Sequence, residues 1–158
     1  MGKTHTPFQG FVYRTLVYIG DTTPFGQAYF ATYFEWQGRA REEFFRQSLP
    51  TAQWILETFH IVTVEASVRY KEQLLLHEPV AIEVRLGELT RASLVLQFTY
   101  RSATRGTVAA EGFQRLVFTN QTGQIVPLPN DIRRYALAYM NLQALLGKPP
   151  NASDPPAP

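Results

Sequence analysis

Four runs of β-branched, aliphatic and aromatic residues follow one another between residues 61 and 119, and they constrain the fold more than any other feature of the sequence. The runs cover residues 61–70, 80–86, 92–101 and 108–119, and turn-forming residues separate them at the interval typical of an antiparallel meander. The first run alternates most cleanly, which predicts a strand with one face toward the core. Its expected core-facing residues are Val62, Val64, Ala66, Val68 and Tyr70.

One long helix is predicted before these strands, over residues 29–46, because an apolar stripe recurs there at helical spacing. The stripe consists of Tyr29, Tyr33, Trp36, Ala40 and Phe44. Two start signals precede or open it, Thr23 followed by Pro24 and the capping box from Thr32 to Glu35. A strand over residues 9–19, a helical turn within 51–58, a short strand over 124–126 and a terminal helix over 132–146 complete the prediction.

A length of 158 residues suits one domain, which we place at residues 8–147, followed by a flexible proline-rich tail at 148–158. The order of elements predicts an α+β fold in which the sheet wraps around the first helix. Such a sheet has open edges, and a second copy of the chain commonly covers one of them. We therefore expect a symmetric dimer.

The composition excludes several classes of function. Cysteine is absent, which removes disulfides, thiolate nucleophiles and cysteine metal sites. The amino terminus lacks an apolar signal region and no run is long enough to span a membrane, so we expect a cytoplasmic protein. The net charge is only +2 with scattered basic residues, which argues against nucleic acid as a partner. The three histidines lack the spacing of metal ligands, and no Gly-x-Ser-x-Gly string occurs.

The segment from Asp21 to Tyr33 and its continuation over 36–41 resemble the signature of the hotdog thioesterases, with the general layout of the 4-hydroxybenzoyl-CoA type. Within that superfamily, the string Trp36-Gln37-Gly38-Arg39, followed by Arg41-Glu42, is similar to the branch that serves enediyne polyketide synthases. The likeness extends to 86–90 and 112–115 and covers most of residues 10–135. It implies a hotdog fold, with a long helix wrapped by an antiparallel sheet of five to six strands and active sites at a dimer interface.

The resemblance also implies a function, the hydrolysis of a β-keto or polyene polyketide thioester on an acyl carrier protein or the carrier domain of a polyketide synthase. The acyl chain is then linked through phosphopantetheine, the enzyme is a homodimer or tetramer, and the chemistry needs neither metal nor organic cofactor. Twelve arginines against three lysines suit an acidic carrier and its phosphate. Two alternatives remain open: an acyl-CoA thioesterase of general fatty-acyl metabolism, and a non-catalytic module that binds acyl chains.

The catalytic pattern departs from the 4-hydroxybenzoyl-CoA type. When the two are aligned on Gly26 and Tyr29, the aspartate of that type falls at Thr23 and its glutamate falls at Gly38, so neither carboxylate is present. The similarity to the enediyne branch points instead to Arg39 as the main catalytic side chain. An alternative reading is structural, because Arg39 stands four residues from both Glu35 and Glu43 and can form a ladder of surface ion pairs.

Free N–H groups around residues 26–30, at the start of the long helix, are the expected donors to the oxyanion. Tyr29 can bond the carbonyl or fill the core, Thr23 can hold the attacking water or cap a helix, and Asp21 and Glu65 are the candidate bases. The residues expected to bind substrate are Gly26, Gln27, Phe30, Phe34, Gln37 and Glu65. Those expected to line an acyl channel are Phe30, Phe34 and Phe45.

Overall fold

The computed structural model describes residues 10–47 and 60–146. In chain order, the elements in these ranges are β1 (Val12–Leu16), the 3₁₀-helix η1 (Ile19–Asp21), α1 (Thr32–Arg46), β2 (His60–Tyr70), β3 (Pro79–Leu89), β4 (Ser93–Ser102), β5 (Val108–Thr119), β6 (Ile125–Val126) and α3 (Asn130–Leu146). The helical turn predicted within 51–58, the tail at 148–158 and the domain limits at 8 and 147 lie outside the described residues.

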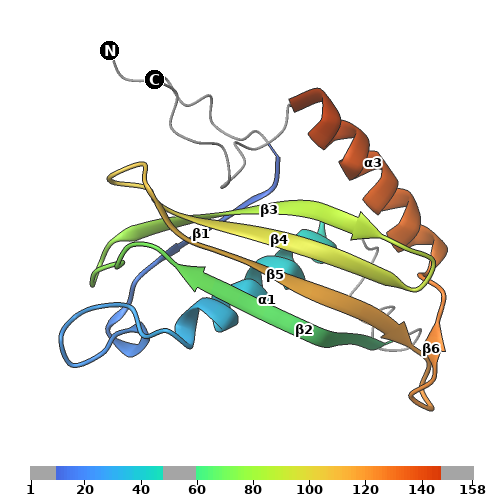
Figure 1. The fold of residues 1–158 in the computed structure, drawn as a ribbon, viewed down its shortest axis with the longest axis horizontal. Helices are drawn as coiled ribbons and strands as arrows, with labels where there is room; N and C mark the ends of the chain where they lie inside the picture. The colour runs from blue at the N-terminus through green and yellow to red at the C-terminus, as the bar shows by residue number, and fades with distance from the viewer. Residues whose placement is uncertain (1–9, 48–59, 147–158) are drawn as a thin grey trace.

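The six strands form one antiparallel sheet. Five of them follow the order β1-β3-β4-β5-β2, and β6 pairs with the C-terminal end of β5. In Figure 1, α1 lies behind this sheet and α3 lies beside β3 at one end. The arrangement confirms the predicted α+β architecture, a long helix wrapped by an antiparallel sheet with a further helix at the C-terminal end.

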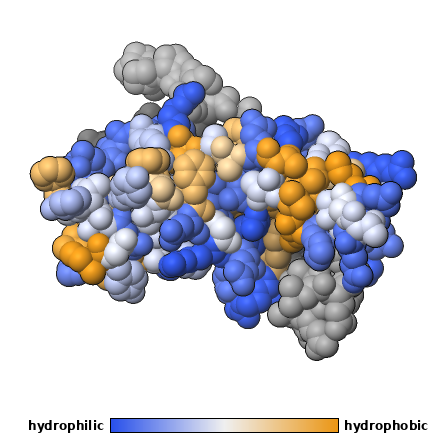
Figure 2. Space-filling model, turned by 90° about the horizontal axis from the view of Figure 1, so that it is seen from below, coloured by the Kyte–Doolittle hydropathy of each residue, from blue (hydrophilic) through white to orange (hydrophobic). Residues whose placement is uncertain are grey.

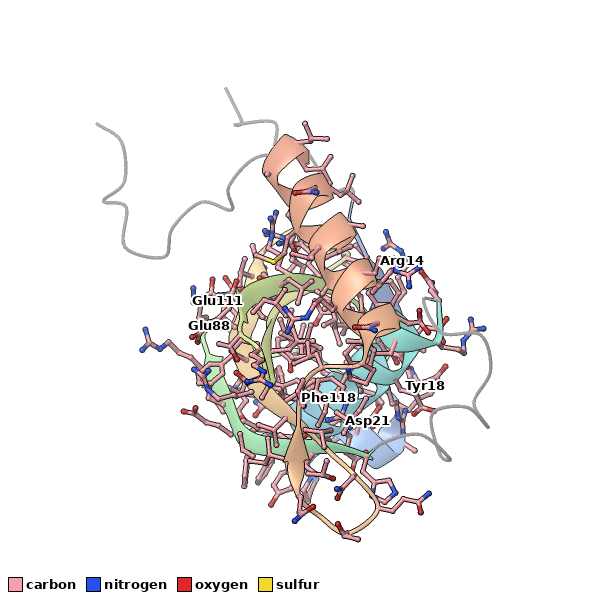
Figure 3. All side chains as sticks on the ribbon, turned by 90° about the vertical axis from the view of Figure 1, so that its right-hand side faces the viewer. Arg14, Tyr18, Asp21, Glu88, Glu111 and Phe118 are labelled. Atoms are coloured by element: carbon pink, nitrogen blue, oxygen red, sulfur yellow. The ribbon has the colours of Figure 1, made fainter. Side chains whose placement is uncertain are left out.

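The core lies between α1 and the concave face of the sheet. Tyr33, Trp36, Ala40 and Phe44 are all buried there, which confirms four of the five positions in the predicted stripe. The fifth, Tyr29, precedes the helix and is exposed, so its prediction as a core residue is wrong. Burying a large apolar side chain contributes on the order of 1.5–3 kcal/mol, so this stripe fixes the helix against the sheet. Figure 3 shows the sheet curving around an interior that contains Phe118, with Glu88 and Glu111 on its outer side.

The start of α1 differs from both sequence signals. The helix begins at Thr32, and no side chain caps it. Thr32 Oγ1 donates to the carbonyl oxygen of Asp21 at 3.2 Å, so the predicted capping box is wrong. No helix begins at Thr23 either, because its Oγ1 accepts a bond from the Phe25 amide at 3.3 Å within a turn. Burial of the apolar stripe, rather than capping, sets the start of this helix.

The first strand of the meander contains a bulge that sequence alternation does not reveal. The register of β2 against β5 shifts between Thr63 and Glu65, which leaves Val64 as an extra residue. One extra residue reverses the faces of the positions beyond it. Thr63 therefore faces α1, while Val62 and Val64 are exposed, contrary to the prediction that these two valines face the core.

The helix α3 closes the edge of β3 beyond the end of β1. Tyr139 Oη donates to the carbonyl oxygen of Val84 at 2.7 Å and accepts from the Phe11 amide at 2.8 Å. The Gln143 carboxamide accepts from the Leu86 amide at 2.5 Å and donates to the Leu86 carbonyl at 2.9 Å, the pair of bonds that a neighbouring strand would make. Within the described ranges, no helix is long and apolar enough to cross a membrane.

Candidate active site

A tight turn built around Gly26 precedes α1. The Thr23 amide donates to the Gln27 carbonyl at 2.7 Å and the Gly26 amide donates to the Thr23 carbonyl at 3.0 Å, which closes the turn. Gly26 has a φ of 77°, a left-handed conformation that glycine adopts without strain. A Cβ placed there would meet nothing within 4 Å, so Gly26 both eases the turn and leaves open space above it.

Free backbone donors lie between this turn and the helix. The amides of Gly26, Ala28 and Tyr29 all donate to carbonyl oxygens. The amides of Phe30 and Ala31 have no acceptor among the described residues. These two N–H groups stand at the positive end of the α1 dipole, where a negatively charged oxygen is stabilised. Within the predicted donor region of residues 26–30, the Gln27 amide also has no acceptor among the described residues, and Ala31 extends the set of free donors by one residue.

Exposed aromatic side chains surround the turn. Phe25 is 87% exposed, Phe30 is 57% exposed, and the rings of Tyr29 and Phe30 pack at 4.5 Å between centroids. Phe34 follows on α1 and is also exposed. Figure 2 looks at the molecule from the β2 side and shows apolar patches on this face. Phe45 differs from these residues, because it is buried in the core and cannot line a channel open to substrate.

The side chain of Asp21, a candidate base, is already engaged. Its Oδ2 accepts a hydrogen bond from the Tyr18 amide at 2.9 Å, which holds the first turn of η1. Its carbonyl oxygen accepts from the Tyr29 amide at 2.8 Å. Asp21 therefore joins η1 to the residues just before α1. The Thr23 hydroxyl, bonded to the Phe25 amide, lies within the Gly26 turn and keeps a lone pair for another partner.

The two residues predicted from the Trp36-Gln37-Gly38-Arg39 string lie in different surroundings. The Arg39 side chain is 56% exposed, and its Nη2 lies 3.9 Å from Glu35 Oε2 on the solvent face of α1. Gln37 is fully buried, and its Nε2 donates to the Ser67 carbonyl of β2 at 2.9 Å. Neither side chain faces the Gly26 turn within one chain. The surface ion pair that the sequence left open for Arg39 is the contact observed.

Arg41 is the arginine of α1 that packs against the sheet, and the sequence reasoning did not select it. Its Nη1 donates to Thr63 Oγ1 of β2 at 2.6 Å and to Gln114 Oε1 of β5 at 3.3 Å. Burial lowers the pKa of the Arg41 guanidinium from its ordinary value, and only Glu42 opposes this effect. A guanidinium removed from water in this way makes stronger hydrogen bonds than an exposed one. Helical spacing is the sequence signal that could have identified Arg41, because residues 37 and 41 lie on the same face of the helix.

Glu65, the other candidate base, lies on the outer side of the sheet. Its Oε2 is 3.6 Å from Arg115 Nε, and the same arginine bonds Glu88, which Figure 3 labels on the outer side. The sheet therefore separates Glu65 from the concave face that holds α1. Within residues 10–47 and 60–146, no three His, Cys, Asp or Glu side chains form a group that could hold a metal ion. The candidate groups on one chain are the free backbone donors and the apolar surface beside the Gly26 turn and, separately, the half-buried Arg41 guanidinium farther along α1.

Comparison with known proteins identifies the fold family. The model of the thioesterase-like superfamily matches residues 17–135. A search of curated protein sequences finds no match. Among solved structures, the chain is similar to a gentisyl-coenzyme A thioesterase at 28% identity and a TM-score of 0.71, covering 77% of this chain and 98% of that one. It is also similar to the dynemicin thioesterase, from a study of polyene binding, at 26% identity and a TM-score of 0.75, covering 82% of this chain and 96% of that one.

A 1,4-dihydroxy-2-naphthoyl-CoA thioesterase from Synechocystis shares the fold, with 18% identity and a TM-score of 0.74 over 80% of this chain and 95% of that one. Each of these chains is covered almost completely, so the likeness extends to the whole domain and not to a fragment. The family model likewise spans η1 through the start of α3. The chain belongs to the thioesterase-like, or hotdog, superfamily and is a thioester hydrolase.

Proposed function

We propose that the protein hydrolyses a long acyl chain, a β-keto or polyene polyketide, from the phosphopantetheine thiol of an acyl carrier protein, at a site shared by two copies of the chain. The observation that carries this proposal is the pair of free amides at Phe30 and Ala31, beside the open space over Gly26 and the exposed aromatic side chains. Preorganised donors stabilise the oxyanion that forms in thioester hydrolysis. The apolar surface offers a place for the acyl chain.

The guanidinium and the free amides of one chain cannot act on one carbonyl. Ala31 and Arg41 stand ten positions apart along α1, and a helix rises 1.5 Å per residue, so roughly 15 Å separates them along the axis. A reacting oxygen needs its donors at about 2.7–3.1 Å. A second copy, with its α1 running in the opposite direction, brings its own Arg41 toward the amides of the first. A two-fold axis at the edge of the sheet produces this arrangement.

The edge that suits this axis is β2. The strand is eleven residues long and largely exposed, and Val62, Val64 and Tyr70 on it are apolar. The opposite edge of the sheet has less exposed strand for pairing, because β1 has only five residues and α3 covers the part of β3 beyond β1. Long exposed apolar edges pair with other strands. Arg41 lies over β2 through its bond to Thr63, so the guanidinium is already beside the proposed interface.

The proposed reaction uses these groups in a fixed order. The thioester carbonyl oxygen accepts hydrogen bonds from the Phe30 and Ala31 amides, and the Arg41 guanidinium of the second copy bonds the same oxygen or the attacking water. Water adds to the carbonyl carbon, and the carbon–sulfur bond of the tetrahedral intermediate then breaks. The thiol leaves as thiolate, which needs no acid because a thiol pKa is about 8.5. The proton lost by water passes to the thiolate or to solvent.

Replacing Arg41 with methionine tests the role of the guanidinium. We expect kcat/KM for an acyl thioester to fall by about 100-fold or more, the effect of losing one donor to an oxyanion. Arg41→Lys keeps the charge but not the planar fork, so it retains part of the activity. Circular dichroism and light scattering check that both variants keep the fold and assembly of the parent.

The matched control is Arg39→Met, which removes the same charge two positions away on α1. We expect activity within a few-fold of the parent, because Arg39 is exposed and paired with Glu35. The opposite result, a large loss for Arg39→Met and none for Arg41→Met, would restore the assignment that the sequence string implies. In that case the proposal for Arg41 is wrong.

The carrier is tested by comparing one acyl chain on two thiols. We expect a higher kcat/KM for the chain on an acidic acyl carrier protein than for the same chain on coenzyme A, since an excess of arginine steers an acidic partner. The similarity to a gentisyl-coenzyme A thioesterase favours the second possibility, an acyl-CoA thioesterase. Equal or better turnover of the coenzyme A thioester would support that function instead.

A further inference from the structure

The segment between β2 and β3, residues 71–78, lies against the Gly26 turn. The Ala28 amide donates to the Leu74 carbonyl at 2.8 Å, and the Leu76 amide donates to the Gly26 carbonyl at 2.9 Å. These two bonds form a short antiparallel ladder centred on Gln27. The position of the turn, and of the free amides that follow it, therefore depends on where residues 71–78 are held.

Glu78 holds the C-terminal end of this segment. Its side chain is only 9% exposed, and Oε2 accepts from the Leu75 amide at 2.9 Å. Its Oε1 accepts from the hydroxyl of Ser102, which is buried at the end of β4. Burial raises the pKa of the Glu78 carboxyl, but the bonds from Ser102 and Leu75 and the charge of Arg105 outweigh it and lower the pKa overall. Glu78 is therefore a carboxylate bonded on both oxygens.

Arg105 holds the other end of the segment at the same time. It lies in the turn between β4 and β5, and its Nε donates to Glu78 Oε1 at 3.0 Å. Its Nη2 donates to the Gln73 carbonyl at 2.8 Å, and its Nη1 lies 3.4 Å from Glu72 Oε2. A planar guanidinium can make these three contacts at once, which an ammonium cannot reproduce. One side chain thus spans residues 72–78.

The backbone of this segment is strained at one residue. His77 has a φ of 62°, in the left-handed region that residues other than glycine rarely adopt. Such a conformation costs on the order of 1–3 kcal/mol and persists where the surroundings over-determine it. The His77 amide donates to the Val17 carbonyl at 2.8 Å, and the contacts of Glu78 follow directly. The segment is therefore held in place by its contacts and is not a relaxed loop.

We propose that Arg105 and Glu78 are positioning residues for thioester hydrolysis, which hold residues 72–78 and, through the ladder at Gln27, aim the Phe30 and Ala31 amides at the oxyanion. This inference rests on the proposed function. Neither side chain touches substrate. Because the amides act on charge that develops only in the transition state, loss of the anchor lowers kcat and leaves KM nearly unchanged.

The test compares Arg105→Gln with Arg101→Gln. Arg101 is also on the β4 side of that turn and pairs with Glu83 at 2.7 Å, but it has no contact with residues 71–78, so it controls for loss of charge and of an ion pair. We expect kcat to fall about tenfold in Arg105→Gln, with KM within about twofold of the parent. Arg105→Lys recovers part of the loss, and Arg101→Gln keeps the parental kcat.

Amide hydrogen exchange gives the readout that does not need activity. We expect the amides of Ala28 and Leu76 to exchange at least about tenfold faster in Arg105→Gln than in the parent or in Arg101→Gln, because local opening follows the loss of its anchor. Glu78→Gln, which keeps the size of the side chain, should accelerate the same two amides.

Unchanged kcat, or unchanged exchange at both amides, in Arg105→Gln and Glu78→Gln overturns the positioning role. If the parent hydrolyses no thioester of either carrier, the proposed function fails and the catalytic meaning of the anchor fails with it. An active parent whose variants keep their kcat defeats the positioning role alone, so the two failures are distinguishable.

Discussion

Arg39 and Arg41 illustrate how two residues of one string can differ in chemistry. Two positions on a helix are separated by about 200° of rotation, so the two side chains point to nearly opposite sides. Arg39 accordingly lies in solvent with Glu35, and Arg41 lies over β2 with Thr63 and Gln114. A guanidinium in the second environment is partly desolvated, which is where a hydrogen bond to a developing charge is most effective.

The left-handed conformation of Gly26 predicts an asymmetry between two glycines. Both Gly26 and Gly38 have open space where a Cβ would lie, but only Gly26 has positive φ. We expect Gly26→Ala to lower the free energy of unfolding by about 1 kcal/mol, and Gly38→Ala, within α1, to raise it by about 0.5–1 kcal/mol. Urea titrations of the two variants and the parent measure both changes. Equal effects would contradict the role assigned to the Gly26 backbone.

Helix α1 and strand β2 are joined at a point that only glycine can occupy. A Cβ on Gly112 of β5 would lie 2.3 Å from the Ser67 carbonyl oxygen and 2.6 Å from Gln37 Nε2. The absence of a side chain at this position lets Gln37 reach from α1 across β5 to the backbone of β2. This bond ties the edge strand to the helix one turn before Arg41 does the same at Thr63.

Gly112→Ala is therefore expected to destabilise the fold by about 1–3 kcal/mol, the usual cost of inserting a methyl group into a packed site with rigid backbone neighbours. The control is Gly87→Ala on β3, whose nearest neighbour is the flexible side chain of Gln97 at 3.1 Å. We expect that variant to lose less than about 1 kcal/mol, since Gln97 can move aside. Denaturant midpoints compare the two. A Gly112→Ala variant as stable as Gly87→Ala would show that Gln37 does not need this space.

Most of the elements were predictable from the sequence because they follow the burial of apolar residues. The four meander strands, the buried stripe of α1 and the terminal helix all appear where periodicity places them. The bulge at Val64 and the start of α1 were not predictable, since each depends on contacts far apart in the chain, such as Thr63 with Arg41 and Thr32 with Asp21. Local signals carry no information on such contacts.

The site was predictable in part, for the same reason. The Gly26 turn follows from the glycine and lies where the sequence places it, whereas the free amides reach Ala31, one residue beyond the predicted region of 26–30. The contact of Glu65 with Arg115 depends on which face of β2 is buried, and the choice between Arg39 and Arg41 depends on which face of α1 meets the sheet. A sequence motif alone does not show which face of β2 is buried or which face of α1 meets the sheet.

At the scale of the whole molecule, the two edges of the sheet differ in how far they are covered. The Tyr139 and Gln143 side chains of α3 close the edge of β3, while β2 keeps a long exposed edge with apolar residues. This asymmetry is the physical basis for expecting one two-fold interface at β2.

A lysine on the open edge is expected to separate the copies. We predict that Val64→Lys is a monomer with intact secondary structure and strongly reduced kcat/KM, because a charged edge disfavours strand pairing. The control is Leu145→Lys, at an exposed leucine of α3, which should keep the parental assembly. Light scattering after size-exclusion chromatography gives the mass of each variant. A dimeric Val64→Lys would exclude this edge as the interface.

The measurement that tests the shared site most directly is complementation between two inactive variants. Arg41→Met removes the guanidinium, and Gly26→Val disturbs the turn that positions the amides. Each alone is expected to be nearly inactive. In a mixed dimer one of the two sites receives both intact parts, so co-expression of the two variants in equal amounts should return about one quarter of the parental kcat per site. Activity no greater than the average of the two single variants, with mixed dimers shown to be present, would contradict a site built from two copies.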